Sequence, residues 1–235
     1  MLTVKQVARD TIKLRVYDAL RRAILEARFR PGEVITLRLG GEALGTSMMP
    51  VREALHRLVA ERALEAQPNR SPRVPVLDET SLREILELRC MLEGRAAAQA
   101  ARVATPADRE EIAAAQTEFA AASRSADPNR YLCANTAFHF AVYQAARMPR
   151  LLPMIESLWL QYAPTFRVTL DAMGPQVFAP DGGLDHHGEL VRALEEKDPD
   201  AAQAAIVRDI LEPTQRPGFW EALTAPPRRG ARRTG

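Results

Sequence analysis

Apolar residues at helical spacing dominate the first 60 residues of the chain. Their three- and four-residue intervals predict a helix that ends before Pro31-Gly32 and a shorter one over residues 37–44. Two adjacent glycines, Gly40 and Gly41, weaken this second helix by about 1 kcal/mol each. A third helix begins at Ser47, a favourable N-cap residue, and runs to Ala60 with a continuous apolar stripe.

A short stretch after the third helix reads as strand rather than helix. Residues 64–66 and 73–76 predict two short strands, which flank a turn at residues 68–71. Three helices followed by a two-stranded ribbon is the order of elements in a winged helix-turn-helix. We therefore expect a mostly α protein whose residues 1–76 form a DNA-binding domain.

From residue 80 to residue 212 the chain is rich in alanine and leucine and shows no strand alternation. Three helix starts are marked by an N-cap residue followed by proline: Thr105-Pro106, Asp127-Pro128 and Asp198-Pro199. Prolines at 149, 153 and 164 are expected to interrupt the helical pattern in the middle of this region. Residues 174–183 are expected to form a loop. We expect a bundle of six to seven helices over residues 77–224 and a disordered basic tail over 225–235.

Composition narrows the class of protein. With 46% hydrophobic and 26% charged residues the chain is expected to be globular. No apolar run is long enough for a membrane span, and the N-terminus lacks a signal-peptide pattern. The only cysteines, Cys90 and Cys133, lie in helical surroundings, which favours a reducing cytoplasm over a disulfide framework.

Charge is distributed unevenly along the chain. The net charge of +2 divides into +6 over residues 1–76, −8 over residues 77–224 and four arginines in the tail. A basic head on an acidic body favours a polyanionic partner for the head, although basic surfaces are often only solvated.

The predicted third helix carries exposed side chains opposite its apolar stripe. Met48, Arg52 and His56 recur every four residues on that face. A helix that enters the major groove needs such side chains near its N-terminus, where arginine can bind guanine or phosphate. The turn before the second strand places Arg70 at the tip of a wing. A solvated helix face explains the same periodicity, so the pattern alone leaves both interpretations open.

Polar residues interrupt four apolar stripes of the helical region, and burying them requires partners. These inward positions are Arg89, the pair Asn135 and His139, His187, and Asp209. Imidazole and carboxylate groups in a bundle core suit Zn, Mn, Fe or Ni. Taken singly, each histidine is more often a hydrogen-bonded core residue, and Arg89 can pair with Glu93 one turn away.

The N-terminal region resembles the GntR family of bacterial transcription regulators. The resemblance rests on Pro31-Gly32-Glu33, on Leu44-Gly45-Thr46-Ser47, on PVREALHRLVAERALEA and on Pro68-Asn69-Arg70. It implies operator contacts by Arg38, Ser47, Met48, Met49 and Arg52. Four positions depart from the family pattern, namely Met48 in place of arginine, Gly40-Gly41 in place of Leu-Ala, and Ser71 in place of glycine.

Residues 80–212 resemble the helical FCD effector domain of the FadR-type branch of this family. The strings that carry the resemblance are LELRCMLEGRAA, NTAFHFAVYQAA and HGELVRALEEKDPDAAQAAIVRDI. It implies that Arg89 binds the carboxylate of an organic-acid effector. It also implies a metal site formed by Asn135, His139, His187 and Asp209. Asp209 stands where the family usually has histidine, which shifts the expected metal from Zn towards Mn or Fe.

These features together favour a homodimeric, ligand-responsive transcription regulator, most simply a repressor, that binds a palindromic operator. Two alternatives remain. A DNA-binding regulator with a vestigial pocket is supported by Asp209 in place of histidine. A metal-dependent enzyme is disfavoured, because no nucleophile elbow or glycine-rich phosphate loop occurs.

Overall fold

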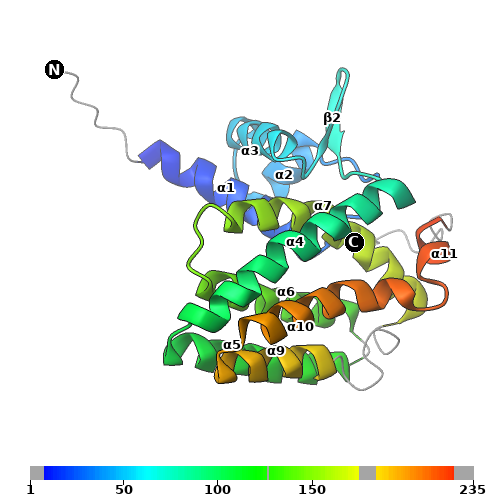
Figure 1. The fold of residues 1–235 in the computed structure, drawn as a ribbon. Helices are drawn as coiled ribbons and strands as arrows, with labels where there is room; N and C mark the ends of the chain where they lie inside the picture. The colour runs from blue at the N-terminus through cyan, green and yellow to red at the C-terminus, as the bar shows by residue number, and fades with distance from the viewer. Residues whose placement is uncertain (1–7, 126, 175–183, 225–235) are drawn as a thin grey trace.

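The computed structural model describes residues 8–125, 127–174 and 184–224, and they form a winged helical head above a helical bundle (Figure 1). The predicted tail and most of the predicted loop at 174–183 lie outside the described residues. No described helix is long and apolar enough to cross a membrane.

The head follows the predicted order of elements. Its helices are α1 (Ala8–Leu25), α2 (Leu37–Leu44) and α3 (Met48–Ala60), and the hairpin strands are β1 (Glu65–Gln67) and β2 (Arg70–Arg73). Their buried apolar residues include Leu20, Ile24, Val51, Leu55 and Leu58. The apolar stripes of α1 and α3 therefore form the core of the head, and the hairpin projects away from the bundle.

The second strand lies earlier in the chain than predicted. Its expected position was residues 73–76, whereas β2 occupies Arg70–Arg73. The turn is shorter than expected because Asn69 adopts a left-handed conformation with φ of 56°, which closes a hairpin tightly. Val74 instead bonds the backbone of the segment before α2, through Gly32 N–H and Glu33 C=O, each at 2.9 Å.

The glycine pair of α2 allows α2 and α3 to approach closely. Both glycines are buried, and a Cβ on Gly40 would lie 2.6 Å from Val51 Cγ1. This close contact with Val51, near the start of α3, therefore offsets the loss of helix propensity at Gly40.

Replacing Gly40 with alanine is expected to lower the free energy of unfolding by about 1–3 kcal/mol, because the stiff valine side chain cannot move away from the new methyl group. Chemical denaturation would measure this change. Gly188→Ala is the matched control, since a Cβ there meets nothing within 4 Å and alanine favours helix. Equal stability of Gly40→Ala and the wild type would show that α2 can shift without cost.

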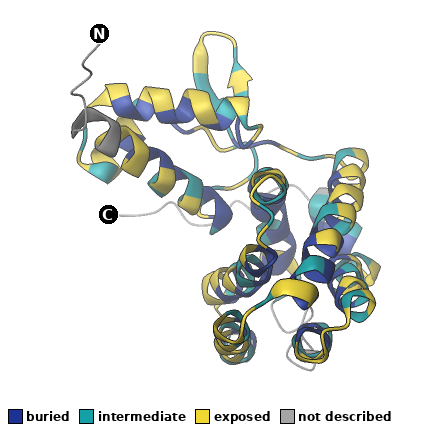
Figure 2. Ribbon diagram, turned by 60° about the vertical axis from the view of Figure 1, so that its left-hand side comes forward, coloured by how far each residue is buried: buried dark blue, intermediate teal, exposed yellow. Residues whose placement is uncertain are grey.

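The bundle is built from long helices. In the described part these are α4 (Glu79–Val103), α5 (Pro106–Ser123), α6 (Pro128–Ala145), α7 (Leu152–Met173), α9 (Leu184–Glu196) and α10 (Pro199–Leu211), followed by the 3-10 turn η1 (Glu212–Gln215) and the short α11 (Phe219–Thr224). The fold class and the number of helices agree with the prediction. Buried positions line the inner faces of the helices, and exposed positions line the outer faces (Figure 2).

The predicted caps explain where several of these helices begin. Thr105 and Asp108 form a complete capping box at the start of α5, and Asp127 and Asp198 cap α6 and α10. Pro164 was expected to interrupt the chain but lies inside α7. It is buried there, so packing of α7 against its neighbours offsets the cost of the lost backbone hydrogen bond.

Helix α7 of the bundle contacts the head. Glu156 pairs with Arg21 of α1 at 2.6 Å, and the Ser157 hydroxyl donates a hydrogen bond to the Glu61 carbonyl just after α3. Near the other end of α7, Asp171 pairs with Arg30 at 2.8 Å. Polar contacts thus link α7 to α1, to the residue that follows α3 and to the segment between α1 and α2.

Candidate functional site

The exposed face of α3 presents the side chains expected to read DNA. Met48 and Met49 are 59% and 60% exposed, and Arg52 and His56 are also exposed. Ser47 occupies the N-cap position, but its side chain makes no capping hydrogen bond. Its hydroxyl is therefore available to a phosphate at the helix N-terminus.

Two further basic residues flank this face. Arg70 is exposed at the start of β2, next to the turn of the hairpin, and Arg38 is exposed on α2. Arg38 pairs with Glu42 at 3.2 Å, but both side chains are largely exposed, so the pair contributes little and a phosphate can replace Glu42. Arg57, which lies beside the predicted face, instead stacks on Tyr17 at 3.7 Å and pairs with Glu61.

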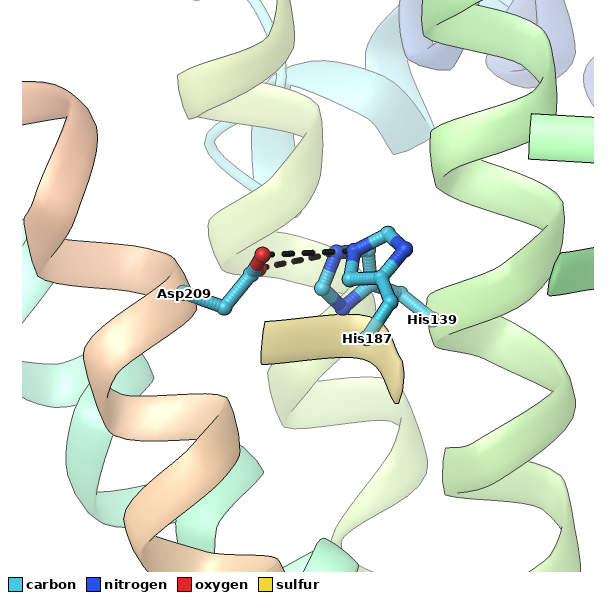
Figure 3. A group of neighbouring side chains, drawn as sticks. All are labelled: His139, His187 and Asp209. Carbon is cyan, nitrogen blue, oxygen red and sulfur yellow. Dashed lines mark ion pairs between the residues drawn. The ribbon is translucent and has the colours of Figure 1, made fainter. Parts of the chain in front are cut away.

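Three predicted metal ligands converge in the bundle core from three different helices. His139 of α6, His187 of α9 and Asp209 of α10 offer ligand atoms that all lie within 4.8 Å of one another. Figure 3 shows both imidazole rings directed at the Asp209 carboxylate. His139 Nε2 lies 3.2 Å from Oδ2, and His187 Nε2 lies 3.2 Å from Oδ1.

The hydrogen bonds behind the rings determine which nitrogen of each histidine is free. Tyr143 donates its only hydroxyl hydrogen to Glu93, so its oxygen accepts from His139 Nδ1–H at 3.0 Å. His187 Nδ1 lies 3.0 Å from the Gln116 side-chain oxygen, which can only accept. Both Nε2 atoms therefore carry lone pairs, and these face the carboxylate.

This donor set fits a divalent cation. Two nitrogen lone pairs and a carboxylate oxygen that face one another in a buried site repel unless a positive charge lies between them. Burial lowers the pKa of His187, which favours the neutral, ligating form. Burial also opposes ionisation of Asp209, but when the two imidazoles are protonated their charge holds the pKa of its carboxyl below the usual range. A cation bound between neutral imidazoles would act on Asp209 in the same direction.

Arg89 lies next to this centre but is already paired. Its side chain is 3% exposed, and Glu93 accepts hydrogen bonds from its Nε at 2.6 Å and its Nη2 at 3.2 Å. The guanidinium stacks between the rings of Trp159 and Tyr162, at 4.5 and 4.2 Å. Glu93 also accepts from Tyr143 and, at 3.0 Å, from Trp159 Nε1.

Hydrogen bonds thus link the arginine to one histidine, from Arg89 through Glu93 and Tyr143 to His139. Asp209 lies between His139 and His187, and His187 is hydrogen-bonded in turn to Gln116. A winged head with an exposed α3 face therefore sits on a bundle with a His-His-Asp cluster in its core. Comparison with known proteins assigns both parts.

The gntR family model of bacterial regulatory proteins matches residues 12–74, and the FCD domain model matches residues 84–212. The chain belongs to the GntR family and carries an FCD domain. Its GntR relatives include the HTH-type transcriptional regulator McbR of Escherichia coli strain K12. That protein is 30% identical over 196 residues, which span 83% of this chain and 88% of McbR.

Two further comparisons agree with this assignment to the GntR family. A relative in Paenarthrobacter nicotinovorans, named "Probable D-xylose utilization operon transcriptional repressor", is 29% identical over 208 residues, covering 88% of this chain and 89% of the relative. The solved structure of E. coli McbR/YncC superposes with a TM-score of 0.80 at 28% identity. That match covers 91% of this chain and 96% of McbR/YncC. The family and these relatives are transcription regulators, not enzymes.

Two further polar residues lie close in sequence to the histidines of the His-His-Asp cluster. Asn135 lies one turn before His139 on α6 and is half-buried, so its role as a fourth ligand stays a prediction. His186, one residue off the inward stripe, lies 3.6 Å from Glu189 on the outer part of α9.

Several residues that complete the FCD site were not predicted from the sequence. Tyr143 and Gln116 position the two histidines, and Trp159 and Tyr162 enclose Arg89. The signal for Tyr143 was present, because it follows His139 by four residues on one helix face. Glu93 was expected only as an ion-pair partner of Arg89. The other three lie on α5 and α7, and no spacing rule connects them to the cluster.

Proposed function

We propose that this GntR regulator is a repressor whose FCD domain holds a divalent metal ion and senses a small carboxylate, which releases the operator. The observation that carries the proposal is the convergence of His139, His187 and Asp209, with both Nε2 lone pairs fixed towards the carboxylate. The relative named a probable D-xylose utilization operon transcriptional repressor supports the direction of regulation.

We expect His139, His187 and Asp209 to hold the metal ion, with Asn135 as a fourth ligand. A bound ion of the Zn, Mn, Fe or Ni class would supply open coordination positions for a carboxylate oxygen. Arg89 would face the same effector, but Glu93 already neutralises its charge. The positive charge that attracts an anion would therefore come mainly from the metal site rather than from the arginine.

DNA contact is assigned to the exposed residues of the head. Ser47, Met48, Met49, Arg52 and His56 lie on or at the start of α3, where major-groove contacts are expected. Arg38 and Arg70 would bind the backbone or the minor groove. A dimer would place two such heads on a palindromic operator.

The route between the two sites runs through α7. One set of its side chains, Trp159 and Tyr162, encloses Arg89. Another set, Glu156, Ser157 and Asp171, contacts the head. An effector that favours one position of α7 would thereby favour one position of α3, which is the differential binding that regulation requires.

To test the proposal, genomic DNA fragments that bind the purified protein are first selected. Fluorescence anisotropy then measures the binding of a selected fragment. A small organic acid is expected to release the fragment and to stabilise the protein by about 2.7 kcal/mol at a hundredfold excess over Kd. Prior chelation, or His187→Ala, should abolish both effects, whereas Arg52→Ala should weaken DNA binding and leave thermal stabilisation by the acid intact.

Elemental analysis of the purified protein provides the check on the metal. A protein that retains no divalent metal and responds to no acid, yet binds the selected DNA, would contradict the sensing proposal. That result would leave the regulator with a vestigial pocket.

A further inference from the structure

The outer face of α4 carries apolar side chains that nothing in the described structure covers. The inner face of this helix packs against α6, α7, α9 and α10. On the outer face Leu88 is 39% exposed and Met91 is 64% exposed. Figure 1 shows α4 lying across the near side of the bundle. Adjacent exposed apolar residues at the centre of a long helix are typical of an interaction surface.

Two opposite charges bracket this apolar pair on the same stripe. Glu84 precedes Leu88 by one turn, and Arg95 follows Met91 by one turn, so the four residues have 4-3-4 spacing. Both charged residues are exposed, and neither makes an ion pair with any described residue. Neighbouring Arg83, by contrast, pairs with Glu79 at 2.6 Å and stacks on Trp220.

The spacing is self-complementary for one arrangement of two helices. The midpoint between Glu84 and Arg95 coincides with the midpoint between Leu88 and Met91. Two copies of α4 packed antiparallel about a twofold axis at this midpoint would place Leu88 of each copy on Met91 of the other. The same axis would place each Glu84 opposite an Arg95. A parallel arrangement would instead oppose like charges, Glu84 to Glu84 and Arg95 to Arg95.

We propose that this stripe, formed by Glu84, Leu88, Met91 and Arg95, is the surface on which a second copy of this chain docks, with the two α4 helices antiparallel. The contact has an apolar centre and a rim of two equivalent ion pairs, as protein interfaces commonly do. Methionine adapts its shape to the opposing leucine. The twofold axis relates the two heads, which is the symmetry that a palindromic operator requires.

Sedimentation velocity over a range of protein concentrations tests the surface without DNA, metal or effector. Glu84→Arg alone and Arg95→Glu alone each create two like-charge contacts per dimer. Each is expected to raise the dimer dissociation constant about tenfold or more. The double variant Glu84→Arg with Arg95→Glu restores opposite charges and is expected to return the dissociation constant to near the wild-type value.

Met91→Ser tests the apolar centre of the contact. Its matched control is Met154→Ser, which changes a methionine on α7 that is also exposed, at 54%. Only Met91→Ser is expected to weaken the dimer. All these positions are exposed, so circular dichroism should show an unchanged fold. A monomeric wild type, a dimer insensitive to the single variants, or a double variant no better than the single ones would each overturn the proposal. None of these outcomes bears on metal or effector binding.

Discussion

Glu93→Gln is expected to lower the free energy of unfolding by about 3–5 kcal/mol, the usual cost of leaving a buried charge without its partner. Burial works against the charge of Arg89, and Glu93 holds the pKa of this guanidinium above its usual range. Glutamine removes that compensation. Its amide nitrogen cannot accept a hydrogen bond, whereas each Glu93 oxygen accepts two, from Arg89 together with either Trp159 or Tyr143. Urea denaturation would measure the change.

Two further variants show whether the unpaired buried charge causes this loss of stability. Glu42→Gln removes the same i,i+4 partner from Arg38, but that pair is largely exposed and should cost well under about 1 kcal/mol. Adding Arg89→Met to Glu93→Gln removes the unpaired charge, so the double variant should be more stable than Glu93→Gln. If the double variant is less stable than the single one, the loss arises from packing instead.

The correct parts of the fold prediction rested on local sequence features, helix spacing and N-caps, that the structure retains. The helix expected over residues 37–44 is observed at Leu37–Leu44, and Thr105, Asp127 and Asp198 cap the helices that they were expected to start. The two errors had different causes, one a buried environment and the other a local turn. Pro164 lies within α7 because that helix is buried around it, and β2 begins early because Asn69 closes a tight turn.

For the candidate site, periodicity indicated which side chains point inward but not which of them meet. Arg89, His139 and His187 are buried as their stripes indicated. Their partners come from positions far apart in sequence, since Glu93 and Tyr143 are separated by 50 residues and Glu93 and Trp159 by 66. Only packing of α4, α6 and α7 brings them together. The pairing of Arg89 with Glu93 followed from their i,i+4 spacing and is confirmed, but its position beside the His-His-Asp cluster could not be predicted from the stripes.

Tyr143→Phe is expected to weaken metal binding by about 10–100-fold, the range found when a partner behind a ligating histidine is removed. Burial and the neighbouring Glu93 raise the pKa of Tyr143 well above its usual value. The hydroxyl therefore keeps its hydrogen, donates it to Glu93 and must accept from His139 Nδ1. Phenylalanine leaves that N–H without an acceptor in a buried site. The ring is then no longer held with its Nε2 lone pair towards Asp209.

Competition with a chromophoric chelator would measure the metal dissociation constant, and Tyr17→Phe is the matched control. Tyr17 is also buried and also donates to a glutamate, Glu61 at 2.6 Å, but it lies on α1 in the head. Its replacement should leave the dissociation constant unchanged. Cobalt loaded in place of the native ion would add a spectroscopic signal that shifts in Tyr143→Phe only. Equal metal affinity in both variants and the wild type would show that Asp209 and the protein backbone orient His139 without the tyrosine. A wild type that binds no metal would instead refute the metal site itself.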